Sequence, residues 1–276
     1  MIKLIVDSTA YVDKAYAEAN DITILPLTIT IQDKEFDDTD VSRNDEFFAL
    51  MKSSGEYPKS SQPNVQVITD SFNKILNNGD EAVVLTISQN LSGTFSTCNM
   101  IKKELDSQDK ITIIDSESTG QTIYFYVMEV VEMVKKGKSR KEILDRITSL
   151  KKESFIQFTP ESLAYLKMGG RIGKINAILG SLLQIKPILC FKNNVLNCVK
   201  KTMGMKKAMV DMIARIPESV KKIFVIQTAK SSNFDDFKAT IQNKFKNAEI
   251  FEGQIGPAVG THVGPAIGVA CLVENI

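Results

Sequence analysis

A loop rich in hydroxyl groups, residues 88–94 (Ser-Gln-Asn-Leu-Ser-Gly-Thr), separates an apolar run from a helical pattern. Residues 82–85 are short and β-branched, which is typical of a buried strand, and residues 95–105 predict an amphipathic helix. A strand-to-helix turn leaves backbone N–H groups free at the helix N-terminus, where the helix dipole favours a negative group. The loop holds no lysine or arginine, so it suits a carboxylate or a single phosphate. The alternative is that Ser92 only caps the helix.

The chain has a single histidine, His262, which lies among glycines and prolines in residues 256–265. Glycines let the backbone approach another group closely, and prolines stiffen a loop. A lone histidine is more often structural than functional, but this setting favours a ligand-facing role. Arg171 follows two glycines, so its guanidinium stands on a flexible turn and can bind a carboxylate or phosphate through two hydrogen bonds. A surface salt bridge is the alternative for Arg171.

Common catalytic and nucleotide-binding signatures are absent from the sequence. Ser92 has Asn90 and Thr94 where a GxSxG elbow needs glycines. Residues 137–139 (Gly-Lys-Ser) lack the upstream glycine of a Walker A motif, and no GxGxxG occurs. These absences disfavour a nucleotide-binding enzyme. A hydrolase pair of Ser92 and His262, oriented by Asp115, stays open as an enzymatic alternative.

Composition excludes several further classes. Lys+Arg 34 against Asp+Glu 33 gives a formal net charge of +1, so no electrostatic case exists for nucleic acid. The four cysteines form no CxxC pair and only one histidine is present, so we expect no metal site and no cofactor. Unpaired cysteines are typical of reduced thiols in a cytoplasmic protein. The chain opens directly with a strand pattern, and we expect no signal peptide.

Residues 255–273 are almost entirely apolar, with glycines at four-residue spacing that imitate a membrane GxxxG face. Pro257, Pro265 and His262 argue against a spanning helix. We therefore predict a loop followed by a buried strand at residues 267–273, and no membrane span.

The elements that must position these groups follow from hydrophobic periodicity. Strands at residues 2–6, 82–87 and 110–114, each followed by a helix, predict a doubly wound, mostly parallel sheet, where ligands bind at the carboxyl ends of strands. Residues 7–9, the loop 88–94 and residues 115–116 would then line one edge together. The remaining predictions for this half are helices at 11–19, 44–52, 64–76, 119–136 and 139–151, a hairpin turn at 32–35 and a loop at 57–63. Residues Val65, Ile68, Phe72, Ile75 and Leu76 are expected to face inward, and Ser139 with Glu142 forms a capping box.

The second half predicts an α+β module. Its expected elements are a strand at 154–158, helices at 160–167 and 176–183, a hairpin of 185–191 with 195–201, a helix at 206–216, a strand at 223–227, a helix at 234–245 and a strand at 249–253. Asn193 and Asn194 favour a type I′ turn in the hairpin. The predicted organisation is therefore a fold of class α/β with two closely packed domains, residues 1–153 and 154–276.

Taken together, seven segments resemble the DegV family of bacterial fatty-acid-binding proteins. In chain order they are residues 7–10 (Asp-Ser-Thr-Ala), 60–63 (Ser-Ser-Gln-Pro), 91–94 (Leu-Ser-Gly-Thr), 115–116 (Asp-Ser), 169–172 (Gly-Gly-Arg-Ile), 186–189 (Lys-Pro-Ile-Leu) and 260–265 (Gly-Thr-His-Val-Gly-Pro). The resemblance implies an N-terminal α/β domain, a C-terminal α+β domain and a long-chain fatty acid in a tunnel between them.

The resemblance also implies roles for particular residues. Ser60 and Ser92 would hold the acyl carboxylate, and His262 would lie close to it. Ser61, Gly93, Thr94 and Thr261 would support these loops. Arg171 would serve phosphoryl transfer onto the bound acid by a separate dihydroxyacetone-kinase-like partner that uses ATP and magnesium.

The resemblance therefore implies a lipid-binding protein that presents its ligand and is not an enzyme by itself. Transient contact with a membrane surface is compatible with this role.

Two departures from the family pattern stand out. Ser60 replaces the usual threonine, which keeps the hydroxyl but loses a methyl group that restrains its rotamer. Ala266 stands where the family often has glycine, which predicts a narrower or reshaped tunnel and leaves chain selectivity open.

Overall fold

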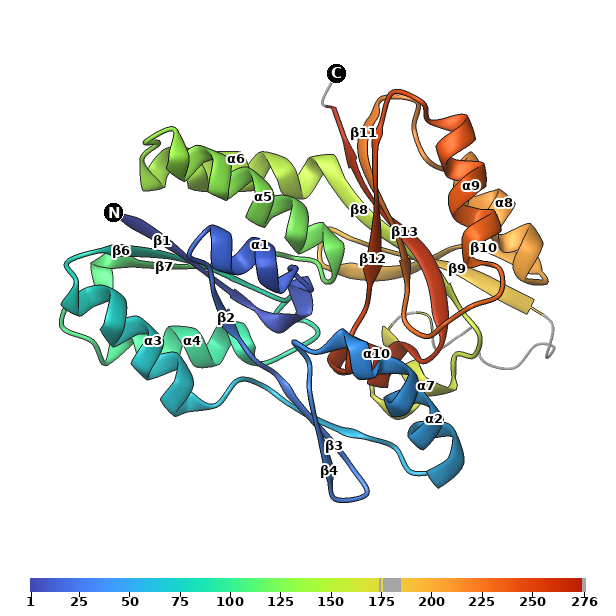
Figure 1. Ribbon diagram of the computed structural model, residues 1–276, viewed down its shortest axis with the longest axis horizontal. Coiled ribbons are helices and arrows are strands. Elements are labelled where there is room, and N and C mark those ends of the chain that lie inside the picture. The colour runs from blue at the N-terminus through green and yellow to red at the C-terminus, as the bar shows by residue number, and fades with distance from the viewer. Residues whose placement is uncertain (174, 176–184, 275–276) are drawn as a thin grey trace.

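The computed structural model describes residues 1–173, 175 and 185–274 (Figure 1). Four parallel strands form the first sheet, in the order β2-β1-β6-β7. These strands are β1 (Ile2–Asp7), β2 (Thr23–Leu25), β6 (Glu81–Thr86) and β7 (Ile111–Asp115). This sheet confirms the predicted doubly wound arrangement, and the protein has an α/β fold.

Helices bury both faces of this sheet. Ile5 packs into one apolar cluster with Ile68 of α3, whereas its neighbours Leu4 and Val6 pack into another with α5. Alternate side chains of a strand point to opposite faces, so a strand covered on both sides is apolar throughout. Figure 1 shows α3 and α4 on one side of the sheet and α1, α5 and α6 on the other. The helices are α1 (Lys14–Ala19), α3 (Val65–Asn77), α4 (Thr94–Lys103), α5 (Gln121–Lys135) and α6 (Arg140–Glu153).

A second, mixed sheet has six strands in the order β10-β9-β8-β13-β11-β12. They are β8 (Ser154–Pro160), β9 (Ile185–Lys192), β10 (Val195–Met203), β11 (Val220–Gln227), β12 (Glu249–Gln254) and β13 (Ala266–Val273), with α8 (Met205–Ala214) and α9 (Phe234–Lys244). Helices α8 and α9 cover one face, and the other face shares a cluster with α5 through Phe224 and Ala270. Helix α5 therefore packs against both large sheets.

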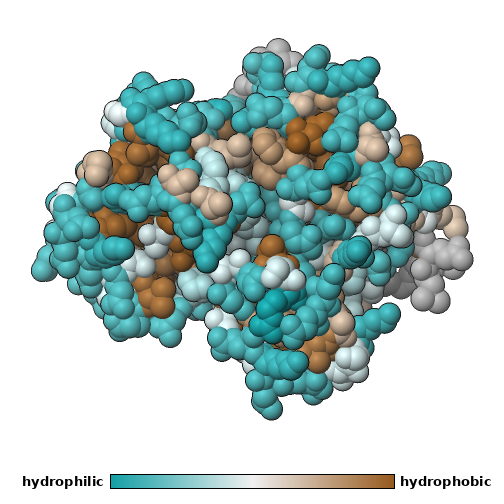
Figure 2. Space-filling view, viewed as in Figure 1, coloured by the Kyte–Doolittle hydropathy of each residue, from teal (hydrophilic) through white to brown (hydrophobic). Residues whose placement is uncertain are grey.

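A third sheet has three strands in the order β4-β3-β5. The hairpin of β3 and β4 agrees with the predicted turn at 32–35, but its pairing with β5 in a separate sheet was not expected from the sequence. The sheet comprises β3 (Thr28–Ile31), β4 (Lys34–Asp37) and β5 (Lys59–Ser61), and it packs with α2 (Asn44–Ser54) and α10 (Pro257–Val263); α7 (Ala164–Met168) lies beside α10. Short 3₁₀ helices span Ser8–Ala10, Val41–Arg43 and Gln108–Lys110. In the same view, hydrophilic residues cover most of the surface, with apolar residues in separate patches (Figure 2).

Three predictions were wrong in informative ways. The predicted loop 57–63 contains β5, because Lys59–Ser61 pair with Thr28–Thr30 of β3. The predicted loop before β13 contains α10, since Pro257 stands in the first turn, where a proline's missing N–H costs nothing. Val65 is 52% exposed. It is the first residue of α3, where the side chain tilts past the helix end and not onto the sheet.

Other boundaries differ by a few residues. The first helix starts at Lys14 because Ser8–Ala10 form a 3₁₀ turn, and α7 starts only at Ala164 because Pro160 still belongs to β8. The capping box of Ser139 and Glu142 is confirmed. The hairpin is confirmed too, with positive φ at Asn193 and Asn194, as a type I′ turn requires. The predicted helix 176–183 lies outside the described residues, and the domain division after residue 153 stays a prediction.

Candidate functional site

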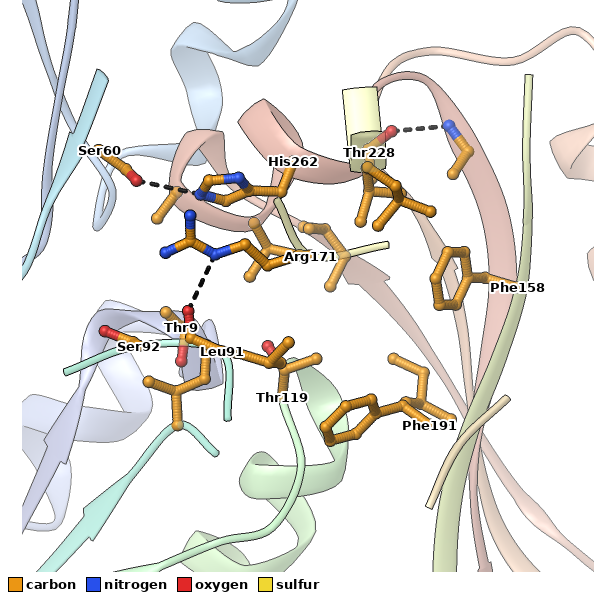
Figure 3. Close-up of a pocket in the computed structure, with 18 of the residues that line it drawn as sticks. Thr9, Ser60, Leu91, Ser92, Thr119, Phe158, Arg171, Phe191, Thr228 and His262 are labelled. Carbon is orange, nitrogen blue, oxygen red and sulfur yellow. Dashed lines mark hydrogen bonds between the residues drawn. The ribbon is translucent and has the colours of Figure 1, made fainter. Parts of the chain in front are cut away.

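A cavity of about 270 Å³ opens among the three sheets (Figure 3). This volume is close to the lower end of the range of about 300–1,000 Å³ found for small-molecule pockets. Most of the wall is apolar, including Phe158 of β8 and Phe191 of β9, and Ala266 also belongs to it. One group of polar wall residues, which includes Ser60, Ser92, Arg171 and His262, lies where β5, the loop 88–94 and the turn after α7 meet, whereas Thr119 and Thr228 line other parts of the wall (Figure 3).

His262 is the centre of this polar end. Helix α10 carries the imidazole to β5, where Nε2 lies 3.0 Å from Ser60 Oγ. On the other side of the ring, Nδ1 lies 2.8 Å from the hydroxyl oxygen of Tyr57. Burial lowers the pKa of His262 to about 4, and the positive charge of Arg171 adds to this shift. The imidazole is therefore neutral at physiological pH, with one N–H donor and one acceptor nitrogen.

Arg171 joins two segments that are far apart in the sequence. Its Nε donates to the carbonyl oxygen of Leu91 at 3.2 Å, and its Nη1 donates to that of Gly169 at 2.6 Å. Figure 3 shows the guanidinium below the imidazole of His262, between Ser60 and Ser92. Among the described residues of the cavity wall, Arg171 carries the one permanently charged side chain. The field at this end of the cavity therefore favours an anion.

The loop 88–94 is held by buried carboxylates beneath it. Asp7 Oδ2 accepts from the Ile87 N–H at 2.6 Å, and Asp115 Oδ1 accepts from the Gln89 N–H at 3.2 Å. Burial raises the pKa of Asp7 to about 6. The strand ends thus lie together as predicted, but these two carboxylates bind the backbone and do not line the cavity, whereas Thr9 does.

Ser92 lies in the cavity wall and forms only a weak cap. Helix α4 begins after Gly93, and Ser92 Oγ lies 3.4 Å from the Thr94 nitrogen and 2.9 Å from Thr94 Oγ1. The hydroxyl thus keeps hydrogen-bonding capacity for a ligand. A Cβ on Gly93 would lie 2.9 Å from Gln62 Oε1, so a larger residue there would displace the end of the Gln62 side chain.

The other predicted site residues divide into two groups. Ser61 and Gly93 line the cavity and are exposed, whereas Thr94 and Thr261 are buried and lie behind the wall. Within the described ranges, Thr261 Oγ1 has no hydrogen-bond partner. Ligand contact by any of the predicted residues stays a prediction.

The residues of the hydrolase alternative are not arranged as a triad. Both ring nitrogens of His262 are engaged by Tyr57 and Ser60, and Ser92 bonds to its neighbour Thr94. Asp115 accepts from the backbone N–H groups of Gln89 and Glu117. In the part of the chain that the structure describes, no group of three or more His, Cys, Asp or Glu side chains could hold a metal ion. Nor does any helix there have the length and apolar character needed to cross a membrane.

Sequence reasoning missed Tyr57 and Gln62 as site residues. Gln62 was inside a recognised motif and could have been included; it lines the cavity and accepts from Thr97 Oγ1 at 2.9 Å. Tyr57 contacts His262 across 205 positions of sequence. No local pattern indicates such a contact.

Comparison with known proteins places this geometry in a family. The profile of the DegV family of uncharacterised proteins matches residues 1–274. A DegV domain-containing protein of Clostridium acetobutylicum is 34% identical over 99% of this chain and 98% of its own length. A crystal structure described as a DegV lipid-binding protein from Thermotoga maritima has a TM-score of 0.87 at 26% identity, covering 99% of each chain. That of DegV, described as a fatty-acid-binding protein from Bacillus subtilis, has a TM-score of 0.86 at 26% identity, again covering 99% of each chain.

Proposed function

The chain belongs to the DegV family, and from this premise and the geometry of its cavity we propose that it binds a long-chain fatty acid. The acyl tail occupies the apolar part of the cavity, and the carboxylate lies at the end formed by Ser60, Ser92, His262 and Arg171. One observation carries the proposal: the described wall of the cavity is largely apolar, and the hydroxyl groups of Ser60 and Ser92 lie together with the imidazole of His262 at one end of it.

The energetics of such a complex agree with this division of the cavity. A buried carboxylate needs hydrogen-bond donors, because an unpaired buried charge is very costly. Hydrogen bonds to a charged group contribute roughly 1.5–3 kcal/mol each. Every buried methylene adds about 0.8 kcal/mol, so a long tail dominates the affinity while the polar end sets the orientation.

Native mass spectrometry of the protein purified from its host cell, followed by lipid extraction, tests the proposal. We expect one long-chain fatty acid per protein molecule, and its chain length shows which acid the cavity prefers. A protein that is empty as purified, and that refuses added fatty acid after delipidation, would refute the proposal.

We further propose that the bound acid is presented to a dihydroxyacetone-kinase-like partner for phosphorylation to an acyl phosphate. The proposal is supported by exposure: Ser61, Gln62 and Gly93 at the polar end reach the surface, whereas Phe158 and Phe191 in the wall are buried. A carboxylate at this end is thus accessible to another protein while the tail stays covered.

Arg171→Ala tests this step. We expect fatty-acid binding to fall less than threefold, because Arg171 Nε and Nη1 already donate to backbone carbonyl oxygens and the hydroxyl donors for the carboxylate remain. Formation of acyl phosphate with the partner and ATP-magnesium should fall at least tenfold. Arg215→Ala, an exposed arginine outside the cavity wall, is the matched control. Equal losses of binding and of acyl phosphate in Arg171→Ala would contradict a separate role in phosphoryl transfer.

A further inference from the structure

Tyr57 contacts His262 at the polar end of the cavity without belonging to the cavity wall, and the proposed function assigns it no role. Its hydroxyl oxygen lies 2.8 Å from His262 Nδ1, and the opposite ring nitrogen lies 3.0 Å from Ser60 Oγ. We propose that Tyr57 is a positioning residue: it donates its proton to Nδ1, holds His262 in the tautomer protonated on Nε2, and so directs the Ser60 hydroxyl proton toward the ligand carboxylate. This inference rests on the proposed fatty-acid-binding function.

The chemistry of a neutral imidazole allows only two arrangements of these three groups. Either Tyr57 donates to Nδ1 and the Nε2–H donates to Ser60, or the Nδ1–H donates to Tyr57 and Ser60 donates to Nε2. In the first arrangement the Ser60 proton is free for a carboxylate. In the second it is consumed by the ring, and the ligand loses a donor. The tautomer of His262 therefore decides whether Ser60 can serve the ligand.

One feature selects the first arrangement, and two more keep the phenol and the imidazole neutral. A phenol is more acidic than an alkyl hydroxyl, which makes Tyr57 a better donor than Ser60 and a poorer acceptor. Burial raises the pKa of Tyr57 to about 12, so the phenol keeps its proton at neutral pH. Burial, and after it the positive charge of Arg171, lowers the pKa of His262, which disfavours a doubly protonated ring that would donate to both hydroxyls.

Gly169 keeps the space that this contact needs. A Cβ on Gly169 would overlap both the Tyr57 hydroxyl and Nδ1 of His262. The φ of Gly169 is negative, so the backbone conformation does not require glycine here. Glycine is required because a side chain would fill the space of these two groups. The first glycine of the Gly-Gly-Arg segment thus lets the phenol reach the imidazole, while the arginine two residues on reaches the loop 88–94.

The tautomer can be read directly because the chain has one histidine. In protein labelled with ¹⁵N-histidine, two-bond ¹H–¹⁵N correlation spectra distinguish Nδ1–H from Nε2–H, with or without added fatty acid. We expect Nε2–H in the wild type and a shift toward Nδ1–H in Tyr57→Phe, which keeps the ring but removes the donor. An Nδ1–H wild type, or an unchanged tautomer in Tyr57→Phe, would overturn the inference.

Binding measurements complete the test. We expect Tyr57→Phe to raise the Kd of a long-chain fatty acid roughly three- to tenfold, the worth of one hydrogen bond. In a Ser60→Ala background the same change should have no further effect, because the group that it orients is gone. Tyr124→Phe is the matched control, since it removes a hydroxyl bonded to Asp13, outside the cavity wall, and should alter neither Kd nor tautomer.

Failure of the inference and failure of the proposed function are distinguishable. A wild type that binds no fatty acid would refute the proposed function, whatever its tautomer. A wild type that binds normally, with Tyr57→Phe equal to it in Kd, would overturn only the role of Tyr57. If the losses of affinity caused by Tyr57→Phe and Ser60→Ala were additive in the double variant, Tyr57 would not act through Ser60 and the inference would be rejected.

Discussion

The two ends of α10 both attach this helix to the first half of the chain, yet they do so differently. At the N-terminal end, Asp38 Oδ1 accepts from the Ala258 N–H at 2.7 Å and Oδ2 accepts from the Ser8 hydroxyl at 2.7 Å. At the C-terminal end, His262 bonds to Tyr57 and Ser60. Each end holds one buried or half-buried titratable group.

The difference lies in what the partners can still do. Next to Asp38, the buried Ser8 hydroxyl donates to the carboxylate and also accepts from the Leu27 N–H at 3.0 Å. Both functions of this hydroxyl are therefore engaged within the protein. The partners of His262 are hydroxyls, which keep both a donor and an acceptor function, and Ser60 lines the cavity. A buried titratable group thus acts as a structural link where its neighbours are saturated, and as part of a binding site where they are not.

The largest expected effects are a loss of stability at the N-terminal end of α10 and a loss of fatty-acid affinity at its C-terminal end. Asp38→Ala leaves the buried Ala258 N–H and Ser8 hydroxyl without their acceptor, which should lower the free energy of unfolding by about 2–3 kcal/mol. His262→Ala should instead raise the fatty-acid Kd about tenfold with a smaller loss of stability. Chemical denaturation and lipid-binding titrations measure both, with the exposed Asp37→Ala as control. Equal stability losses at both ends would remove the distinction.

The two ends should also respond to pH with opposite signs. Burial raises the pKa of Asp38 from 3.8 to about 7, so the folded protein binds the extra proton and this contribution to stability is lost as pH rises through 7. The pKa of His262 is lowered from 6.5 to about 4, so its contribution is lost as pH falls below 6.5.

Unfolding free energies measured from pH 5 to 8 check these signs. Relative to wild type, Asp38→Asn should lose the decline toward high pH, and His262→Gln should lose the decline toward low pH. Each change is expected to be on the order of 1 kcal/mol across the range. Parallel pH profiles for the two variants would show that neither group titrates as inferred.

The smallest effects come from two adjacent glycines with different requirements. Gly169→Ala should raise the fatty-acid Kd a few-fold, because a Cβ would displace Tyr57 from His262. Gly170 has φ +71° with open space around its Cβ position, so Gly170→Ala should cost about 1 kcal/mol of stability and leave affinity unchanged. Titration and denaturation of both variants would decide; a binding defect confined to Gly170→Ala would reject the assignment.

Local patterns in the sequence were sufficient for most of the secondary structure. The apolar runs of β1, β6 and β7 predicted a parallel sheet, Ser139 and Glu142 predicted a helix start, and Asn193-Asn194 predicted a hairpin. These features depend on residues within a few positions of each other, so periodicity and capping chemistry reveal them. The ordered motifs likewise indicated the family and drew attention to Ser60, Ser92, Arg171 and His262.

Tertiary structure alone decided the rest. The strand Lys59–Ser61 exists because β3 offers it a partner, and α10 starts at Pro257 next to the distant carboxylate of Asp38. The contact of Tyr57 with His262 likewise joins residues far apart in the chain. Which hydroxyl faces which ring nitrogen depends on how the sheets pack, because a hydrogen bond requires a distance that neither propensity nor motif spacing contains.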